Sequence, residues 1–308
     1  MYRPDDHYLW DFWTAQRGSE THLFYLQAPR TPHDPELRHA GAQVGHAVST
    51  DLRHWTYRGL AFGRGPRGAW DNQAIWTGSV IAHGNGWAMA YTGTSTAENG
   101  HIQRVGLALS DDLDAWTRVG DGLALQADLT LYRGQNPDHD NELAWRDPFL
   151  AKNPSGEGYL AYITAQVRDA AGGYPGCIAL ATSPDLVCWT VLPPVARDLG
   201  FFLMEVPQLV ELGDRWALLF CARGNWIAPQ HPFAGQSGTY AAFAESPAGP
   251  FRDPQLVLPA GRNGAYAAKV VERDGERVMM AWEGYQPYGG LAGSLTDPLP
   301  LPACLQRR

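Results

Sequence analysis

The stretch "STDLRHW" at residues 49–55 occurs twice more, as "SDDLDAW" at 110–116 and "SPDLVCW" at 183–189, and a degraded copy, "SPAGPF", lies at 246–251. Each copy follows a short apolar run that is typical of a β-strand. Ser and Asp side chains cap tight turns through backbone N–H groups, and a Trp beside such a turn fills space between neighbouring sheets. The copies therefore predict a structural repeat, and we assign them no catalytic role.

A second series of segments alternates with these turns. Its five members are apolar, aromatic and β-prone: "HLFYLQA" (22–28), "WAMAYTGT" (87–94), "YLAYITA" (159–165), "WALLFCA" (216–222) and "VMMAWEG" (278–284). One unit of a few such strands cannot bury both faces of its sheet, whereas five units arranged radially can. No segment has a helical period of useful length. The sequence therefore predicts an all-β fold, a five-bladed β-propeller.

Composition and charge exclude several classes of function. The 12 Trp and 13 Tyr suit both strands and sugar-binding clefts, and the 34 Gly and 23 Pro indicate many turns. The net charge is −8, Lys152 and Lys269 are the only lysines, and no basic stripe is present. This pattern argues against nucleic acid and anionic membranes as partners. No apolar stretch reaches the ~20 residues that span a bilayer.

The sequence also predicts the cellular location and the absence of a cofactor. The first 30 residues contain no apolar stretch of a secretory signal, so we expect a cytoplasmic protein. The four cysteines have no metal-ligand spacing, and we expect them reduced. The glycine-rich stretch at 63–68 lacks the context of a phosphate-binding loop. The acidic loop "NPDHDNE" (136–142) raises the question of a cation site, but we expect a solvated turn and no metal.

Three carboxylates stand alone in apolar or aromatic surroundings. They are Asp11 in "YLWDFW" (8–13), Asp147 in "WRDPFL" (145–150) and Glu205 in "FFLMEVPQLVEL" (201–212). Each lies just ahead of a strand of the second series, where the innermost strand of a blade is expected. An isolated buried carboxylate is costly without a partner or a function, and Arg146 is available as a partner. Two facing carboxylates are the minimum for glycoside hydrolysis, and structural ion pairs are the alternative.

The stretch "VGHAVSTDLRHW" (44–55) resembles the signature of glycoside hydrolase family 32, the invertases and fructan hydrolases. Further segments resemble motifs of that family in the same order: "YRPDDHYLWDFW" (2–13), "WTGS" (76–79) with "YTG" (91–93), "WRDP" (145–148), "MEVPQLVEL" (204–212), "GAYAAK" (264–269), "VMMAWEGY" (278–285) and "LAGSLTDPLPL" (291–301). The resemblance covers nearly the whole chain. His46 falls in the signature, and we expect it to be structural.

Three features depart from family 32. The segment "WDFW" (10–13) looks more like the nucleophile motif of family 68, the levansucrases and related fructosyltransferases. Val206 replaces the Cys that follows the acid/base Glu in the family. About 25 residues follow the last repeat strand, so we expect a propeller without the C-terminal β-sandwich typical of family 32. A homodimer or a partner subunit that covers the exposed propeller edge is a hypothesis.

The resemblance implies a role for each of the three acids. Asp11 is then the nucleophile, Glu205 the general acid/base, and Asp147, beside Arg146, the residue that binds ring hydroxyls and stabilises the transition state. Such enzymes retain the anomeric configuration, so the carboxyls of Asp11 and Glu205 should lie about 5–5.5 Å apart. The candidates for sugar contact share an aromatic, hydroxyl or guanidinium group: Trp10, Trp13, Trp76, Ser79, Arg146 and Trp282.

Three functions remain open from the sequence. The first is a retaining glycoside hydrolase, with residues 1–308 as one catalytic domain, that acts on sucrose, fructo-oligosaccharides or fructan, with water or a sugar as acceptor. The second is an arabinofuranosidase or arabinanase of the family 43 type, which inverts and needs a carboxyl separation of about 6.5–9.5 Å. The third is a propeller that binds a carbohydrate without cutting it.

Overall fold

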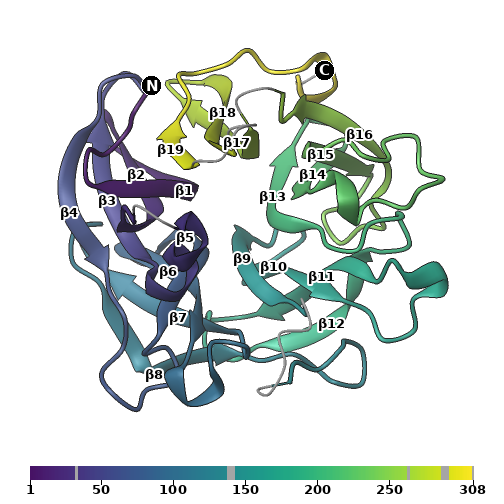
Figure 1. The fold of residues 1–308 in the computed structure, drawn as a ribbon, viewed down its shortest axis with the longest axis horizontal. Helices are drawn as coiled ribbons and strands as arrows, with labels where there is room; N and C mark the ends of the chain where they lie inside the picture. The colour runs from purple at the N-terminus through teal and green to yellow at the C-terminus, as the bar shows by residue number, and fades with distance from the viewer. Residues whose placement is uncertain (32–33, 137–142, 262–263, 286–290, 307–308) are drawn as a thin grey trace.

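The computed structural model describes residues 1–31, 34–136, 143–261, 264–285 and 291–306. Its strands form five antiparallel sheets around a central axis, and the chain passes from one sheet to the next around the ring (Figure 1). All nineteen strands of the described residues belong to these sheets. The predicted all-β fold, a five-bladed β-propeller, is confirmed.

Each blade begins at the axis and continues outward in chain order. Blade 1 contains β1 (His7–Arg17), β2 (Glu20–Pro29), β3 (Gln43–Ser49) and β4 (Thr56–Phe62). Blade 2 contains β5 (Ala74–His83), β6 (Gly86–Thr94), β7 (Arg104–Ser110) and β8 (Thr117–Leu125). Blade 3 contains β9 (Trp145–Lys152), β10 (Tyr159–Gln166), β11 (Gly176–Ser183) and β12 (Thr190–Ala196).

The last two blades follow the same order. Blade 4 contains β13 (Glu205–Glu211), β14 (Trp216–Ala222), β15 (Gly238–Ala244) and β16 (Arg252–Pro259). Blade 5 contains β17 (Ala265–Arg273), β18 (Glu276–Tyr285) and β19 (Leu291–Leu295). Short 3-10 helices lie between strands or near the chain end: η1 (Pro35–Gly41), η2 (Thr96–Glu98), η3 (Ala171–Gly173), η4 (Gly224–Trp226) and η5 (Ala303–Leu305). None of the helices within the described ranges is long and apolar enough to cross a membrane.

The repeated turns join the third strand of a blade to the fourth. In blade 2, Ser110 Oγ accepts a hydrogen bond from the N–H of Leu113 at 2.9 Å. Asp112 Oδ1 accepts hydrogen bonds from the N–H groups of Asp114 and Ala115, both at 2.9 Å. Leu113 has a φ of 70°, and its counterparts Leu52 and Leu186 have φ values of 60° and 69°. A leucine in this region is strained by itself, so the polar side chains hold the turn. The predicted capping role of Ser and Asp is confirmed.

The Trp residues of the repeats pack between neighbouring blades. Trp116 of blade 2 contacts Phe24 of blade 1 edge to face, with ring centroids 5.7 Å apart. Trp189 of blade 3 packs against the core cluster that blades 2 and 3 share. His46 is buried in blade 1 and stacks on Phe24 at a centroid distance of 4.8 Å. These side chains therefore belong to the packing of the blades.

The innermost strand of each blade is interrupted by a β-bulge at a corresponding place. The bulges lie around Asp11 in β1, Thr77 in β5, Asp147 in β9, Val206 in β13 and Ala267 in β17. A bulge re-aims the side chains beside it and breaks the regular alternation of a strand. Because the five innermost strands contact one another around the axis, the bulges turn residues from different blades toward a shared centre.

The ring closes where the beginning of the chain meets blade 5. Tyr2 pairs with Leu295 of β19 through two backbone hydrogen bonds of 3.0 and 2.8 Å. Figure 1 shows both ends of the chain on the same side of the ring. The first blade is therefore held directly against the last, which stabilises the arrangement of the innermost strands.

Candidate active site

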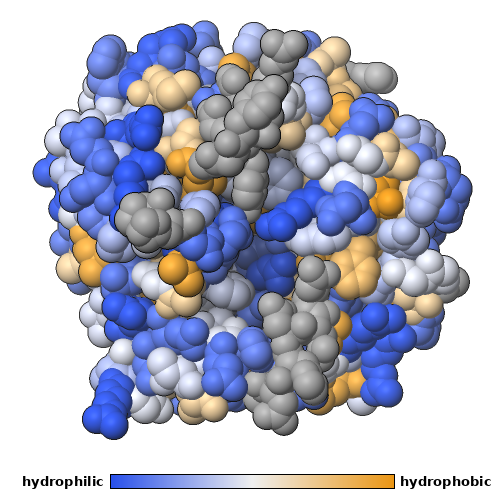
Figure 2. Space-filling view, in the orientation of Figure 1, coloured by the Kyte–Doolittle hydropathy of each residue, from blue (hydrophilic) through white to orange (hydrophobic). Residues whose placement is uncertain are grey.

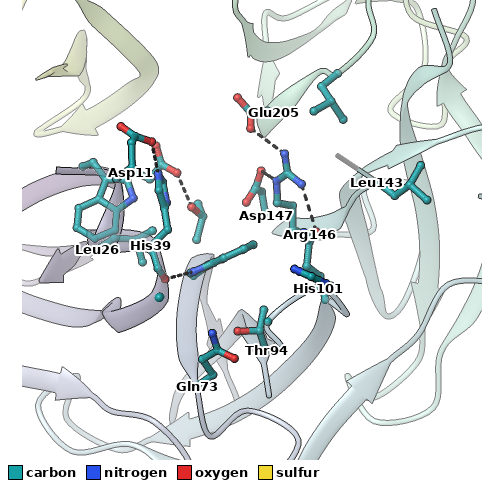
Figure 3. A pocket seen from close by; sticks show the side chains of 18 of the residues that line it. Asp11, Leu26, His39, Gln73, Thr94, His101, Leu143, Arg146, Asp147 and Glu205 are labelled. Atoms are coloured by element: carbon teal, nitrogen blue, oxygen red, sulfur yellow. Dashed lines mark hydrogen bonds and ion pairs between the residues drawn. The ribbon is translucent and has the colours of Figure 1, made fainter. Parts of the chain in front are cut away.

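A cavity of about 450 Å³, lined by both polar and apolar side chains, lies at the centre of one face of the propeller. Figure 2 shows that this centre is hollowed and that hydrophilic residues gather there. Residues from blades 1, 2, 3 and 4 line the cavity, and the three acids predicted from the sequence are among them: Asp11, Asp147 and Glu205. Figure 3 shows Asp11 on one side of the cavity and Glu205, with Arg146 and Asp147, on the other. The fold thus brings together three acids that are far apart in the sequence.

Asp11 sits in the bulge of β1 with a φ of 25°. Its Oδ2 accepts a hydrogen bond of 2.6 Å from Thr77 Oγ1, and its Oδ1 accepts one of 2.9 Å from the indole N–H of Trp282. Burial raises the pKa of Asp11, while the hydrogen bond from Thr77 opposes this effect. Two donors on different blades therefore orient the carboxylate and favour its charged form.

Asp147 sits in the bulge of β9 with a φ of 58° and is buried. Its Oδ2 accepts hydrogen bonds from the N–H of Val206 at 3.1 Å and from Thr164 Oγ1 at 3.2 Å. The guanidinium of Arg146 lies 3.7 Å from the same oxygen. Burial raises the pKa of Asp147 to about 7, although the charge of Arg146 acts in the opposite direction. Burial thus disfavours the charged form of Asp147, and Arg146 counteracts this effect.

Glu205 begins β13 and is held from two sides. Arg146 donates a hydrogen bond of 2.8 Å to its Oε1, and Tyr266 of blade 5 donates one of 2.9 Å to its Oε2. Burial lowers the pKa of Arg146, but Glu205 and Asp147 outweigh this effect and raise it overall. Burial also raises the pKa of Tyr266 above its ordinary value, so its phenol stays protonated and remains a donor. Each carboxylate oxygen of Glu205 thus has its own donor.

Lys269 braces the bulge that follows Glu205. Its ammonium donates hydrogen bonds to the carbonyls of Val206 at 3.0 Å and Pro207 at 2.9 Å. Val206 has a φ of 54°, a conformation that a β-branched residue rarely adopts. Lys269 is buried, and burial lowers its pKa to about 8. The lysine therefore holds a strained backbone in place next to the carboxyl group of Glu205.

The predicted sugar-contact residues divide into three groups. Trp10, Trp76 and Arg146 line the cavity. Trp282 does not line it but supports Asp11 through its indole N–H. Trp13 and Ser79 lie outside the lining as well: Trp13 stacks on Phe24, and Ser79 Oγ accepts a hydrogen bond from the N–H of Leu150. The structure therefore does not bring Trp13 and Ser79 to the cavity, because both are used in packing between strands.

Sequence reasoning missed several residues that contact the acids, line the cavity or support the backbone beside it. Thr77 lies inside the segment "WTGS" but was not predicted, because regular strand alternation places neighbouring residues such as Trp76 and Thr77 on opposite faces of the sheet. The bulge in β5 instead brings both side chains to the cavity. Tyr266 and Lys269 both lie in "GAYAAK", a segment noted only for its resemblance. His39 also lines the cavity, and its carbonyl accepts a hydrogen bond of 2.8 Å from the indole N–H of Trp76. Thr77, Tyr266 and Lys269 lie in segments that the resemblance had already singled out, and the polar residues of those segments are the signal that could have identified them.

Within the described ranges, no group of three or more His, Cys, Asp or Glu side chains is arranged to hold a metal ion. The acidic loop at 136–142, where a cation site was considered, lies outside the described residues except for Asn136. All four cysteines carry free thiols, and two of them are buried.

Comparison with known proteins identifies the family. Residues 15–289 match the family described as "Glycosyl hydrolases family 32 N-terminal domain". The chain belongs to glycosyl hydrolase family 32. The matched range begins after Asp11.

Curated family relatives are similar over most of this chain. A sucrose-6-phosphate hydrolase of Salmonella typhimurium is 26% identical over 277 residues, which are 85% of this chain and 53% of the relative. An extracellular sucrase of Zymomonas mobilis is 29% identical over 82% of this chain and 71% of the relative. A fructan 6-exohydrolase of Beta vulgaris is 30% identical over 54% of this chain and 26% of the relative. The chain spans about half the length, or less, of several relatives that it matches.

Solved structures share the fold. An inulosucrase from Halalkalicoccus jeotgali bound to kestose has a TM-score of 0.74 at 23% identity and covers 94% of this chain and 80% of its own. A sucrose-6-phosphate hydrolase from Lactobacillus gasseri also has a TM-score of 0.74, at 22% identity, over 98% of this chain and 62% of its own. At these identities the likeness concerns the propeller fold alone.

Proposed function

We propose that this protein is a retaining glycoside hydrolase that acts on β-fructofuranosides. The observation that carries the proposal is the convergence of Asp11, Asp147 and Glu205 from three blades on one cavity, with donors to each carboxyl group. Membership of family 32 and the names of the relatives, which include sucrose, fructan and sucrose-phosphate hydrolases, support the same substrate class.

In the first step, an oxygen of Asp11 attacks the anomeric carbon of the fructosyl group and forms an ester with it. The bond between that carbon and the bridging oxygen breaks, and the oxygen leaves with its electron pair and the proton of Glu205. The hydrogen bonds from Thr77 and Trp282 fix the direction of the attacking carboxylate. The fructosyl group is then attached to the enzyme and the leaving sugar departs.

In the second step, Glu205 takes a proton from a water molecule whose oxygen attacks the anomeric carbon, and the Asp11 carboxylate is released. Two inversions retain the configuration. A sugar hydroxyl in place of water gives transfer instead of hydrolysis, and we propose this as a secondary activity. The prediction of a carboxyl separation of about 5–5.5 Å between Asp11 and Glu205 belongs to this mechanism.

Asp147 is proposed to hold the ring hydroxyls of the fructosyl group. The hydrogen bonds that it accepts from Val206 and Thr164 are both on Oδ2, which leaves Oδ1 for a hydroxyl of the substrate. A carboxylate that accepts such a hydrogen bond stabilises the positive charge that develops at the sugar ring in the transition state. Trp10 and Trp76 are proposed to contact the apolar face of the sugar.

The experiment that tests this function is sugar release from a panel of sucrose, sucrose 6-phosphate, kestose, inulin, levan and an aryl arabinofuranoside. Wild type is compared with Asp11→Asn, a substitution of equal size that removes the nucleophile. We expect fructose from the wild type and a loss of at least about 10⁴-fold in kcat for the variant. An NMR record of the first product formed gives its anomeric configuration.

Other products, or the absence of any product, would indicate other functions. Release of arabinose with inversion supports the family 43 type of activity and contradicts the proposal. Binding of sugars by both proteins with no product from either indicates a carbohydrate-binding propeller. Fructosylated sugars among the products measure the share of transfer.

Residues 1–308 are proposed to form one catalytic domain, as a homodimer in the cytoplasm. The free thiols of all four cysteines support a reducing compartment. Light scattering on the purified protein tests the dimer, and fractionation of cells that produce it tests the location. Of the relatives, one is named an extracellular sucrase, so the fractionation has a clear alternative outcome.

A further inference from the structure

Two of the bulges at the axis take backbone groups out of the strand ladder. Thr77 is the extra residue of the bulge in β5, and Asp147 lies in the bulge of β9, so neither has a partner in the register of its strand pair. Both residues are buried. A buried N–H or C=O group without a partner costs free energy, so these bulges need hydrogen bonds from side chains.

The hydroxyl group of Thr92 in β6 bonds to both bulges. It donates a hydrogen bond of 2.9 Å to the carbonyl of Thr77 and accepts one of 2.9 Å from the N–H of Asp147. Thr92 is fully buried and is not among the residues that line the central cavity. One hydroxyl therefore ties the bulge of blade 2 to the bulge of blade 3 from a place outside the proposed active site.

Through Thr77, the hydroxyl of Thr92 acts on the proposed nucleophile. The side chain of Thr77 donates a hydrogen bond of 2.6 Å to Asp11 Oδ2. The hydrogen bond from Thr92 holds the carbonyl of the same residue and so fixes the place from which Thr77 donates. A shift of this bulge would turn the carboxylate that attacks the anomeric carbon.

Through Asp147, the same hydroxyl acts on the side of the cavity opposite Asp11 (Figure 3). Asp147 has a φ of 58°, a conformation that persists only where the surroundings hold it. Its Oδ2 accepts a hydrogen bond from the N–H of Val206 and lies 3.7 Å from Arg146, which donates to Glu205. A displacement of Asp147 would therefore reach the general acid/base.

We propose that Thr92 is a positioning residue for the reaction at this site. By joining two bulges, its hydroxyl sets the position of Asp147, which holds the ring hydroxyls, relative to the nucleophile, Asp11. The inference rests on the proposed function for the roles of these two acids. The joining of the bulges is a matter of geometry, which a measurement without substrate can test.

Thr92→Val tests the proposal, because valine keeps the shape of threonine and lacks the hydroxyl. Steady-state kinetics on sucrose and kestose compare this variant with the wild type, well below both melting temperatures. We expect kcat to fall by about 30-fold and KM to change less than about threefold, since a small misplacement of the acids affects the transition state most. Thr92→Ser restores the hydroxyl, and its kcat should lie within about threefold of the wild type. Thr92→Ala replaces the valine variant if that variant does not fold.

Thr21→Val is the matched control. Thr21 is a similarly buried threonine of blade 1, whose hydroxyl donates a hydrogen bond of 2.7 Å to Gln16 Oε1 outside the cavity lining. Its kcat should stay within about twofold of the wild type. A double variant adds a second check. Thr92→Val combined with Asp147→Asn should lose no more than about threefold beyond Asp147→Asn alone, because both substitutions act on the same carboxylate.

A normal kcat in Thr92→Val, an equal loss in Thr92→Ser, or losses that multiply in the double variant would overturn the positioning role. Crystal structures of Thr92→Val and Thr92→Ser give a readout that does not depend on turnover. We expect the carboxyl group of Asp147 to move by more than about 0.5 Å in the valine variant and to stay in place in the serine variant. If the wild type releases no sugar, this displacement still supports the role of Thr92 while the proposed function fails, and an unmoved Asp147 contradicts that role.

Discussion

Aspartates occupy two contrasting places in this propeller. The turn aspartates, Asp51, Asp112 and Asp185, lie between the outer strands, where each accepts hydrogen bonds from two backbone N–H groups. The cavity aspartates, Asp11 and Asp147, lie in bulges of the innermost strands and are surrounded by other blades. The same side chain is thus used in two different electrostatic environments.

The two environments shift the pKa in opposite directions. Hydrogen bonds from backbone N–H groups lower the pKa of Asp112 and Asp185. Burial raises the pKa of Asp11 and Asp147. A turn aspartate therefore stabilises the fold as an anion, whereas a cavity aspartate costs stability when it ionises. Carboxyl groups whose pKa is strongly shifted by burial in a cavity are typical of functional sites, which supports a functional role for the cavity pair.

The largest expected difference between the cavity aspartates and the turn aspartates is in the effect of a substitution on enzymatic activity. Asp147→Asn should lower kcat by about 10³-fold, because the amide does not carry the negative charge that stabilises the transition state. Asp112→Asn, the same substitution in a turn, should leave kcat/KM within about twofold. Steady-state kinetics on sucrose and kestose compare the two variants. Equal losses at both places would show that the contrast has no functional meaning.

A smaller loss is expected when the support of the Glu205 bulge is removed. Lys269→Met fills the same space but no longer holds the carbonyls of Val206 and Pro207, so Glu205 should shift. We expect kcat to fall by about 10²-fold with a smaller change in KM. Lys152→Met, at the other lysine of the chain, is the matched control and should retain full activity. A correctly folded Lys269→Met enzyme with normal kcat contradicts this role.

The pH dependence of stability should differ in sign between the two places. The folded-state pKa of Asp147 is raised to about 7 from 3.8, so its contribution to stability is fully present at low pH and is lost as the pH rises through about 7. Asp147→Asn removes this loss. The melting temperature of Asp147→Asn minus that of the wild type should therefore be a few degrees larger at about pH 8 than at about pH 5. A constant difference would contradict the raised pKa.

The smallest expected effect is at the turn. Asp112→Ala removes the acceptor for the N–H groups of Asp114 and Ala115 and should lower the melting temperature at neutral pH by about 2–4 °C. The pKa of Asp112 is lowered in the folded state. The difference in melting temperature between variant and wild type should therefore shrink as the pH falls below the pKa of Asp112 in the unfolded chain. Calorimetric scans at neutral and acidic pH test this; a difference that grows in acid would sink the explanation.

The fold was predictable because its signals are local. The Ser and Asp of each turn act on N–H groups two or three residues away, so their spacing is visible in the sequence itself. The strands of the second series are apolar because they are covered by neighbouring blades. The three acids were also visible, since a lone carboxylate in an apolar run is unusual.

The residues around the acids were harder to predict, because a bulge shifts the alternation of a strand. Trp10 and Trp13 flank Asp11, but the first lines the cavity and the second packs on Phe24. Ser79 was among the predicted sugar contacts, whereas Thr77, whose hydroxyl contacts Asp11, was not. No local pattern in the sequence reports the position of such a bulge.

By itself, the sequence determined the repeat, the number of blades and the identity of the acids, because turn capping and strand patterning depend on near neighbours. Only the tertiary structure decided which partner each acid has: Arg146 donates to Glu205 across 59 residues, and the indole of Trp282 reaches Asp11 across 271. It also decided the direction of each pKa shift. Burial arises from strands of other blades, and no short stretch of sequence contains them.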